Sequence, residues 1–170
     1  MDEQDFGAET PSTPQPNGMD TAPAVGLISQ YVKDLSFENP NAPGVFQNTQ
    51  GPEINVQFDI ASNQVAEDAF EVTLKIDVRA ENDGRVTFLV ELAYAGLFGL
   101  RNVPEDAIQP FLLGEAPRLL FPFARRVVAD TIRDGGFPPL LLEPIDFNAL
   151  YHQQSAQRDA QLAAGNFGQA

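Results

Sequence analysis

The segment Ser36–Phe46, with the sequence SFENPNAPGVF, marks the point where a strand gives way to a rigid loop. Up to its second residue, the chain alternates, and Tyr31, Leu35 and Phe37 are predicted to share one face of a β-strand. The two prolines of the segment fix φ, remove backbone donors and push the residues before them out of the helical region. The sequence therefore predicts a strand that ends here and a stiff loop that follows it.

Four segments alternate apolar and polar residues with a period of two, which is typical of half-buried strands. They are Leu27–Phe37, Ile54–Ile60, Phe70–Val78 and Val86–Tyr94. The turn Glu81–Gly84 contains Asn-Asp-Gly, whose residues tolerate positive φ and favour a hairpin. Alternation on one side predicts an antiparallel sheet with one buried face.

The second half of the chain has a helical period. Pro104–Asp106 resembles a first helical turn, with a proline and two acids at the positive end of the helix dipole. Three prolines, the last of them Pro122, are expected to interrupt or restart the helix. An apolar stripe that includes Leu119 and Phe123 ends at Gly135. Strands followed by helices predict an α+β fold, a four-stranded antiparallel sheet with helices packed on one face.

Two irregular segments stand out. Gly96–Gly99 is predicted to be a bend where the fourth strand leaves the sheet. Phe137–Pro144 contains three prolines, so it is an extended loop, and it is rich in leucine and phenylalanine. Asp146 is placed to cap a final helix. The apolar loop either folds over the sheet as ordinary core or walls a groove that takes apolar segments of another chain.

Composition limits the function. The 170 residues suit one domain, and 10 basic against 24 acidic residues leave a formal charge of −14. That charge repels phosphate backbones and anionic lipids, so we expect no nucleic-acid partner. No apolar run approaches the ~18 residues of a membrane span, and the N-terminal residues lack the pattern of a secretory signal. We therefore expect no direct membrane insertion and a cytoplasmic location.

The chain lacks the usual reactive groups. It has no cysteine and a single histidine, His152, which excludes disulfides, thiolate sites and metal sites built on several imidazoles. Phosphate-binding loops, dinucleotide fingerprints and nucleophile elbows are also missing. The acidic pairs at Glu67–Asp68 and Glu81–Asp83 lie in predicted turns, where carboxylates are usually solvated. We expect no catalytic residue, no metal and no cofactor, and thus no enzyme.

Both ends differ in composition from the middle. Residues 1–24 are acidic and rich in proline, without lysine or arginine, and are predicted to be a disordered tail. Residues 154–170 are rich in alanine, glutamine and glycine, so they are predicted to be a helix end and a flexible tail. The ordered domain is expected to span residues 25–153.

Four motifs, in order, resemble the SecB family of bacterial protein-export chaperones. They are Ser36–Phe46, the strand pair Ala69–Phe98, LLFPFAR at Leu119–Arg125, and FPPLLLEPIDFNALY at Phe137–Tyr151. The resemblance covers about residues 28 to 153. The chain departs from better-known members in its lack of cysteines and its longer, proline-rich N-terminal segment.

The resemblance implies an ATP-independent chaperone that holds unfolded precursor proteins in an export-competent state and delivers them to the SecA translocation motor. It also implies a homotetramer, a dimer of dimers. Clients would bind in a long apolar groove. The implied lining residues are Ile54, Val56, Phe58, Phe88, Phe123, Phe137, Leu140, Leu142 and Tyr151.

The same resemblance assigns SecA docking to Asp34, Glu38, Leu89 and Glu91. Alternation places these residues on the outward side of the first and fourth strands, so they would form an acidic patch with one apolar member. The simpler reading is a solvated sheet face, which any half-buried sheet presents. An apolar residue between the acids favours docking.

Two other functions remain open. One is a SecB-like chaperone dedicated to a single cognate partner, such as a toxin–antitoxin component, and the breadth of clients would separate it from a general chaperone. The other is a small-molecule-binding protein that uses the same apolar pocket, for which a closed cavity with converging polar groups would be the sign.

Overall fold

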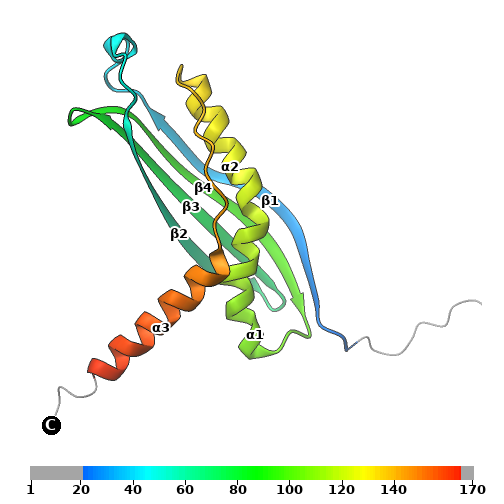
Figure 1. Ribbon diagram of the computed structural model, residues 1–170. Coiled ribbons are helices and arrows are strands. Elements are labelled where there is room, and N and C mark those ends of the chain that lie inside the picture. The colour runs from blue at the N-terminus through cyan, green and yellow to red at the C-terminus, as the bar shows by residue number, and fades with distance from the viewer. Residues whose placement is uncertain (1–20, 166–170) are drawn as a thin grey trace, which may run out of the picture.

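The computed structural model describes residues 21–165 and shows a four-stranded antiparallel sheet with helices on one face (Figure 1). The elements in chain order are β1 (Ala24–Glu38), η1 (Gly44–Gln47), β2 (Glu53–Ala66), β3 (Ala69–Asn82), β4 (Arg85–Arg101), α1 (Glu105–Pro110), η2 (Phe111–Glu115), α2 (Ala116–Asp134) and α3 (Phe147–Gly165). The strand order is β1-β4-β3-β2. The α+β fold is thus confirmed, while the tail predictions for residues 1–20 and 166–170 lie outside the described residues.

The β3–β4 hairpin forms where the sequence predicts it. Asp83 and Gly84 have φ values of 50° and 74°, the left-handed pair that a tight hairpin turn requires. Across this hairpin, Ile76 pairs with Leu92 and Val78 with Val90, and all four side chains are at most 2% exposed. These residues form the centre of the face that the helices cover, here called the inner face.

The prediction of a bend at Gly96–Gly99 is wrong, because β4 continues to Arg101 and stays paired with β3 as far as Gly99 and with β1 as far as Arg101. Gly96 serves helix packing instead. A Cβ atom built there would lie 2.7 Å from Leu120 Cδ2, a side chain of α2 that is fully buried. The missing side chain therefore lets α2 approach the sheet closely.

The pairing of β1 with β4 shifts register twice, between Leu27 and Ser29 and between Val32 and Asp34. Each shift inserts an extra residue, as a β-bulge does, and reverses the face on which the following residues lie. Tyr31 consequently pairs with Ala95 and lies on the outer face. The expectation that Tyr31 shares a face with Leu35 and Phe37 is wrong for this reason.

The helices begin and end close to the predicted residues. α1 starts directly after Pro104, and α2 ends before Gly135 and Gly136, the latter with φ of 90°. Pro122, however, lies inside α2 without ending it. The buried stripe of α2 consists of small and large apolar residues together, namely Ala116, Pro117, Leu120, Phe121, Ala124, Val128, Ala129 and Ile132.

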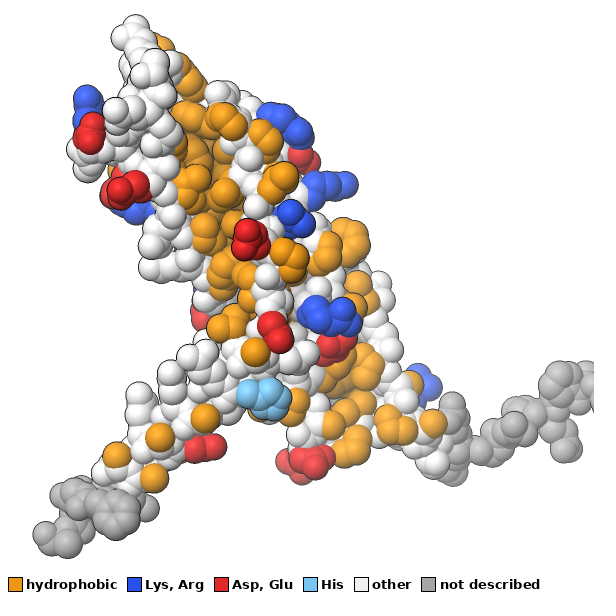
Figure 2. Space-filling model, in the orientation of Figure 1, with side chains coloured by type: hydrophobic (Ala, Val, Ile, Leu, Met, Phe, Trp, Pro, Cys, Tyr) orange, Lys and Arg blue, Asp and Glu red, His pale blue; other side chains and the backbone are white. Residues whose placement is uncertain are grey.

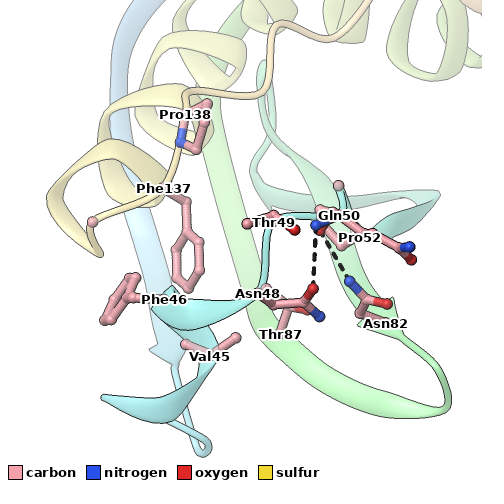
Figure 3. A pocket seen from close by; sticks show the side chains of 12 residues that line it. Val45, Phe46, Asn48, Thr49, Gln50, Pro52, Asn82, Thr87, Phe137 and Pro138 are labelled. Atoms are coloured by element: carbon pink, nitrogen blue, oxygen red, sulfur yellow. Dashed lines mark hydrogen bonds between the residues drawn. The ribbon is translucent and has the colours of Figure 1, made fainter.

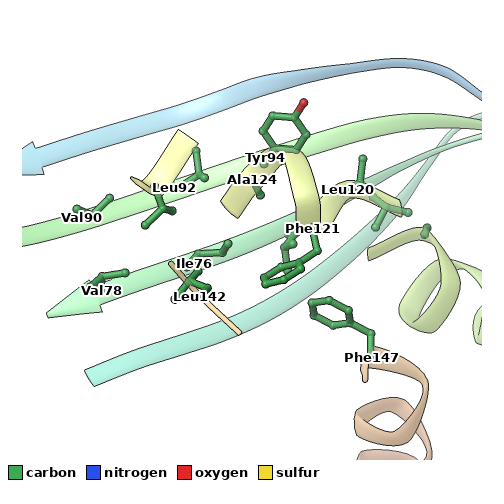
Figure 4. Packing of buried hydrophobic residues seen from close by; sticks show 14 of the residues in the cluster. Ile76, Val78, Val90, Leu92, Tyr94, Leu120, Phe121, Ala124, Leu142 and Phe147 are labelled. Atoms are coloured by element: carbon green, nitrogen blue, oxygen red, sulfur yellow. The ribbon is translucent and has the colours of Figure 1, made fainter. Parts of the chain in front are cut away.

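The start of α3 is fixed to the core while the rest of the helix projects away from the sheet (Figure 1). The predicted cap is confirmed, because Asp146 Oδ1 accepts the N–H of Ala149 at 3.0 Å. Phe147 is 1% exposed and points toward Phe121 (Figure 4). Beyond Phe147, α3 has no buried residue.

Candidate functional site

A cluster of four aromatic rings lies at the end of the inner face next to η1. Phe88 stacks on Phe37 at 6.2 Å between ring centroids and meets Phe137 at 4.9 Å. Phe46 of η1 contacts Phe137 from the other side at 5.1 Å. The loop after β1 and the segment after α2, far apart in the sequence, are thus held together by aromatic contacts.

Beside this cluster is a hollow of about 310 Å³ (Figure 3). Its apolar side is formed by Val45, Phe46, Phe137 and Pro138. Its polar side is a small network in which Asn48 Oδ1 accepts the N–H of Gln50 at 3.2 Å and Asn82 Nδ2 donates to the Gln50 carbonyl at 3.0 Å. No charged side chain lines the hollow among the described residues. It therefore suits an apolar side chain flanked by a peptide backbone.

A second aromatic cluster lies further along the inner face, where α3 begins. The rings of Phe58, Phe121 and Phe147 contact one another edge-on, at 5.6 to 6.4 Å between centroids, and Figure 4 shows Phe121 and Phe147 close together. Phe121 and Phe147 are buried, whereas Phe58 of β2 is half-buried. Phe58 is therefore the member of this cluster that an incoming apolar segment reaches.

Between the clusters, apolar side chains form a continuous band on the inner face, flanked by α2 and the segment 137–146 (Figure 2). Ile54 is 43% exposed, and Val56, Phe137, Leu140 and Tyr151 are half-buried. Leu141, in the segment after α2, is 64% exposed. The segment thus covers the sheet incompletely and leaves apolar surface open to water.

Three of the residues assigned to the groove take other positions. Phe88 and Leu142 are buried, at 2% and 6% exposure, so they support the band from beneath. Phe123 is 45% exposed and lies outside the buried stripe of α2, where Phe121 faces Phe58 instead.

The residues that sequence reasoning missed are Phe46, Phe121 and Phe147. For Phe121 the signal was present, since Pro117, Phe121, Ala124 and Val128 recur at helical spacing once small apolar residues are counted. Phe46 and Phe147 border loops, where no period marks the buried side. Their positions depend on tertiary contacts.

The four residues that the sequence predicts for docking share the outer face of the sheet. Glu38 pairs directly with Leu89, Ser36 with Glu91, and Asp34 with Ala93, and directly paired residues lie on one face. The carboxylates of Asp34, Glu38 and Glu91 make no ion pair with any residue between 21 and 165. A shallow hollow of about 250 Å³ is lined by Asp34 and Glu91 together with Asp77 and Lys75 of β3. The structure therefore places all four predicted residues on one face, in a mainly acidic surface that also carries Lys75.

Next to this surface, Glu71 is held by two neighbours from β1. Its carboxylate accepts hydrogen bonds from Lys33 Nζ and from the Tyr31 hydroxyl, both at 2.5 Å. The lysine bond first, and then the tyrosine bond, lower the pKa of Glu71, while the same carboxylate raises the pKa of Tyr31. The two bulges of β1 make this contact possible, since they turn Tyr31 and Lys33 outward.

The free edge of β1 is apolar. Its large exposed side chains are Val25, Leu27, Ile28, Tyr31, Val32 and Leu35, each between 37% and 62% exposed. Backbone groups along an edge strand are unpaired on one side, and a long apolar edge is open to pairing with another strand.

Two kinds of site are missing from the described part of the chain. No cluster of three or more histidine, cysteine, aspartate or glutamate residues within 21–165 has the arrangement of a metal site. Across those same residues, no helix is long and apolar enough to cross a membrane.

The model of the family described as "Preprotein translocase subunit SecB" matches residues 18–158. The chain belongs to the SecB family. The protein-export protein SecB of Sphingopyxis alaskensis is 66% identical over 140 residues, which cover 82% of this chain and 81% of that one. The protein-export protein SecB of Rhizorhabdus wittichii is 60% identical over 154 residues, or 91% and 93% of the two chains. These relatives establish the role of a SecB chaperone in protein export.

A solved structure agrees with the fold. A SecB-like chaperone of Mycobacterium tuberculosis, in complex with a ChAD peptide from the HigA1 antitoxin, superposes with a TM-score of 0.61. The alignment covers 71% of this chain and 90% of that one, at 20% identity. At this identity the similarity extends to the fold, and it confirms the arrangement of sheet and helices.

Proposed function

We propose that this SecB chaperone holds unfolded precursor polypeptides on its inner face, without ATP, and delivers them to the SecA motor. The observation that carries the proposal is the open apolar band between the two aromatic clusters. Burial of apolar surface contributes about 25 cal/mol per Å² and requires no particular sequence. A band of this kind therefore selects unfolded chains, whose apolar segments are exposed.

Within the proposed groove the residues divide into two groups. Ile54, Val56, Phe58, Phe137 and Leu140 offer accessible surface to the client, while Phe88 and Leu142 support them from the core. Tyr151 closes the end at α3, and Phe123 offers a separate exposed ring on α2. Several weak contacts along one flexible client add through effective concentration. Bound clients are withdrawn from folding and from aggregation.

We assign delivery of clients to SecA to the outer face of the sheet. Asp34, Glu38 and Glu91 are unpaired carboxylates around half-buried Leu89, which suits a basic partner surface with an apolar centre. We propose that SecA docks there. Because inner and outer faces belong to the same sheet but point in opposite directions, a client and the motor can be bound at the same time.

We further propose that the chain works as a homotetramer in the cytoplasm and catalyses no reaction. The support for assembly is the exposed apolar edge of β1, which pairing with a second copy would cover. A dimer made in this way, joined to a second dimer, would give four grooves. A single molecular-mass measurement by light scattering tests the assembly.

The holding activity is tested with a chemically unfolded client diluted into buffer. The intact chaperone should suppress aggregation and delay refolding without added nucleotide. Replacing Ile54 and Phe58 with asparagine should weaken client binding about tenfold, since apolar contact area is lost. Asn63→Asp, which changes another residue of β2, should leave binding unchanged. If the intact protein neither suppresses aggregation nor delays refolding, the proposal is wrong.

Docking is tested separately by charge reversal. Glu91→Lys should weaken SecA binding about tenfold or more while client holding is retained. Glu53→Lys, a matched reversal on the outward side of β2, should leave SecA binding nearly unchanged. Parallel loss of both activities in Glu91→Lys would indicate misfolding, and retained SecA binding would contradict the assignment.

A general chaperone and one dedicated to a single partner differ in the breadth of their clients. Binding of several unrelated unfolded proteins with similar affinity supports the general function. Binding of one protein alone would favour the dedicated function.

A further inference from the structure

A further cavity, of about 230 Å³, lies between α2 and the start of α3. Most of its walls are apolar, and two arginines, Arg118 and Arg125, complete the lining. The apolar residues are Phe121, Pro122, Pro144, Ile145 and Phe147. No acidic side chain lines this cavity among the described residues.

The two arginines differ in their partners. Arg118 donates to Glu115, with Nε 3.0 Å from Oε2, and this pair holds the pKa of Glu115 below its usual range. Arg125 makes no ion pair with any residue of 21–165. Its Nε atom is buried and has no hydrogen-bond acceptor. Arg125 therefore brings a positive charge without an ion-pair partner to a cavity whose other walls are mostly apolar.

This combination selects a ligand that carries a carboxylate next to an aromatic ring. The planar guanidinium of arginine binds carboxylates with strong, charge-assisted hydrogen bonds. An apolar cavity of about 150 Å³ is large enough for benzene, so this cavity accommodates a phenyl ring. A basic segment would be repelled.

We propose that the N-terminal segment MDEQDF of the same chain binds in this cavity. Residues 1–20 contain five acids and no lysine or arginine, and Phe6 is their one aromatic residue, directly after Asp5. In the proposed contact the ring of Phe6 lies among the apolar walls, and a carboxylate of the segment accepts a hydrogen bond from Arg125.

The length of the chain allows this contact. Fourteen residues lie between Phe6 and Thr21, where the described structure begins. The fifteen steps from one Cα atom to the next reach about 50 Å at roughly 3.3 Å per residue. The whole of α2 is about 29 Å long at 1.5 Å per residue. β1 starts at the end of the molecule where α1 lies (Figure 1), and the cavity is in the first half of α2.

If clients bind on the inner face as proposed above, a segment in this cavity affects their binding. Phe121 and Phe147 contact Phe58 directly, and Phe58 faces the proposed groove. Phe58 is not among the residues that line the cavity, so the competition that we propose acts through the two rings that Phe58 contacts. The acidic N-terminal segment thus acts as a built-in competitor.

The contact itself is tested on the full chain, which has no native cysteine. A nitroxide attached at Ala8→Cys should reduce the methyl signal of Ile145 several-fold and leave that of Val45, in η1, unchanged. Arg125→Gln should abolish the reduction. Arg126→Gln, the adjacent exposed arginine of α2, should retain it.

A second variant guards against misfolding of Arg125→Gln. Phe6→Ala changes nothing within the described structure and should also restore the Ile145 signal. An undiminished Ile145 signal in the parent chain, or a reduction that both variants retain, would overturn the proposal. A reduction that also appears when spin-labelled chains are mixed with separate isotope-labelled chains would assign the contact to a second copy and overturn binding within one chain.

Competition with clients is measured with the triple variant Asp2→Asn, Glu3→Gln and Asp5→Asn. Its affinity for an unfolded client should rise about threefold at low salt and converge with that of the parent at high salt, where charge contacts are screened. Equal affinity at low salt would overturn the competition. Absence of client holding in both chains would instead contradict the proposed function and leave the spin-label result standing.

Discussion

The two faces of the sheet are made by the same strands and have opposite character. On the inner face, Leu74, Ile76 and Val78 of β3 are at most 2% exposed. On the outer face, their neighbours Lys75 and Asp77 are exposed. A period of two along each strand is thus sufficient to separate an apolar face from a charged face of the same sheet.

Helix α2 is too narrow to cover the whole inner face of the sheet. Four strands spaced about 4.8 Å apart are wider than one helix of about 10 Å diameter. α2 therefore buries the central strands, while Ile54 of β2 and Leu35 of β1 remain 43% and 41% exposed. In the proposed function one open margin receives clients and the other a second subunit.

The strongest test of this difference is a substitution at the end of the inner face. Phe147→Ala removes a ring that is 1% exposed and contacts Phe58 and Phe121. We expect a loss of about 3–5 kcal/mol in unfolding free energy, measured by chemical denaturation. Leu162→Ala, at a position that is 68% exposed in the same helix, should change stability by less than about 0.5 kcal/mol. Similar effects for the two would show that α3 is not anchored by Phe147.

Overpacking at the contact between β4 and α2 should have the next largest effect. Gly96→Ala places a Cβ atom 2.7 Å from Leu120 Cδ2, and we expect a loss of about 1–3 kcal/mol. Gly26→Ala in β1 is the matched control, since no atom lies within 4 Å of the added carbon. Thermal unfolding that leaves the midpoint of Gly96→Ala unchanged would contradict the close approach of α2.

Removal of the cap of α3 should cost less. Asp146→Ala deletes the acceptor for the Ala149 N–H, and we expect a loss of about 0.5–2 kcal/mol. Asp146→Asn retains an acceptor and should restore most of the stability. If the asparagine variant is as unstable as the alanine variant, the carboxylate acts by its charge instead of as a hydrogen-bond cap.

The smallest effect on stability is expected for a substitution on the outer face, at Glu71. Ionised Glu71 is bound to Lys33 and Tyr31, and its pKa is lowered from the usual 4.5. The stability that ionised Glu71 adds to the folded state is fully present above about pH 4.5. It is lost as the pH falls through the lower pKa that Glu71 has in the folded state. Glu71→Gln should therefore cost about 1 kcal/mol or less at pH 7, and the difference should shrink toward pH 3. A difference that grows on acidification would contradict the assignment.

The sequence predicted those parts of the fold that depend on local period and turn chemistry. The alternation of β2, β3 and β4, the hairpin at Asp83 and Gly84, and the cap at Asp146 follow from neighbouring residues. The bulges of β1 do not, because an extra residue in one strand is defined by its partner strand. The face of Tyr31 was therefore not predictable from its own segment.

The candidate site was predictable to a similar extent. The motif match predicted both proposed surfaces. The side of α2 that faces the sheet, however, was set by small residues such as Ala124, which fit between helix and strands. For that reason Phe121 lies against Phe58 where Phe123 had been expected. From the sequence, Gly96 likewise predicts a bend. Its role in helix packing depends on Leu120, which is distant in the sequence.

The central claim is that the inner face stays open to unfolded clients while the outer face stays free for docking. Side-chain labelling by a small reactive carbene, with and without a saturating unfolded client, tests it most directly because it distinguishes the two faces of one strand. The account predicts that a client reduces labelling of Ile54, Phe58 and Leu140, and leaves Glu38 and Glu91 unchanged. Protection of Glu38 and Glu91, with Ile54 and Phe58 unchanged, would contradict it.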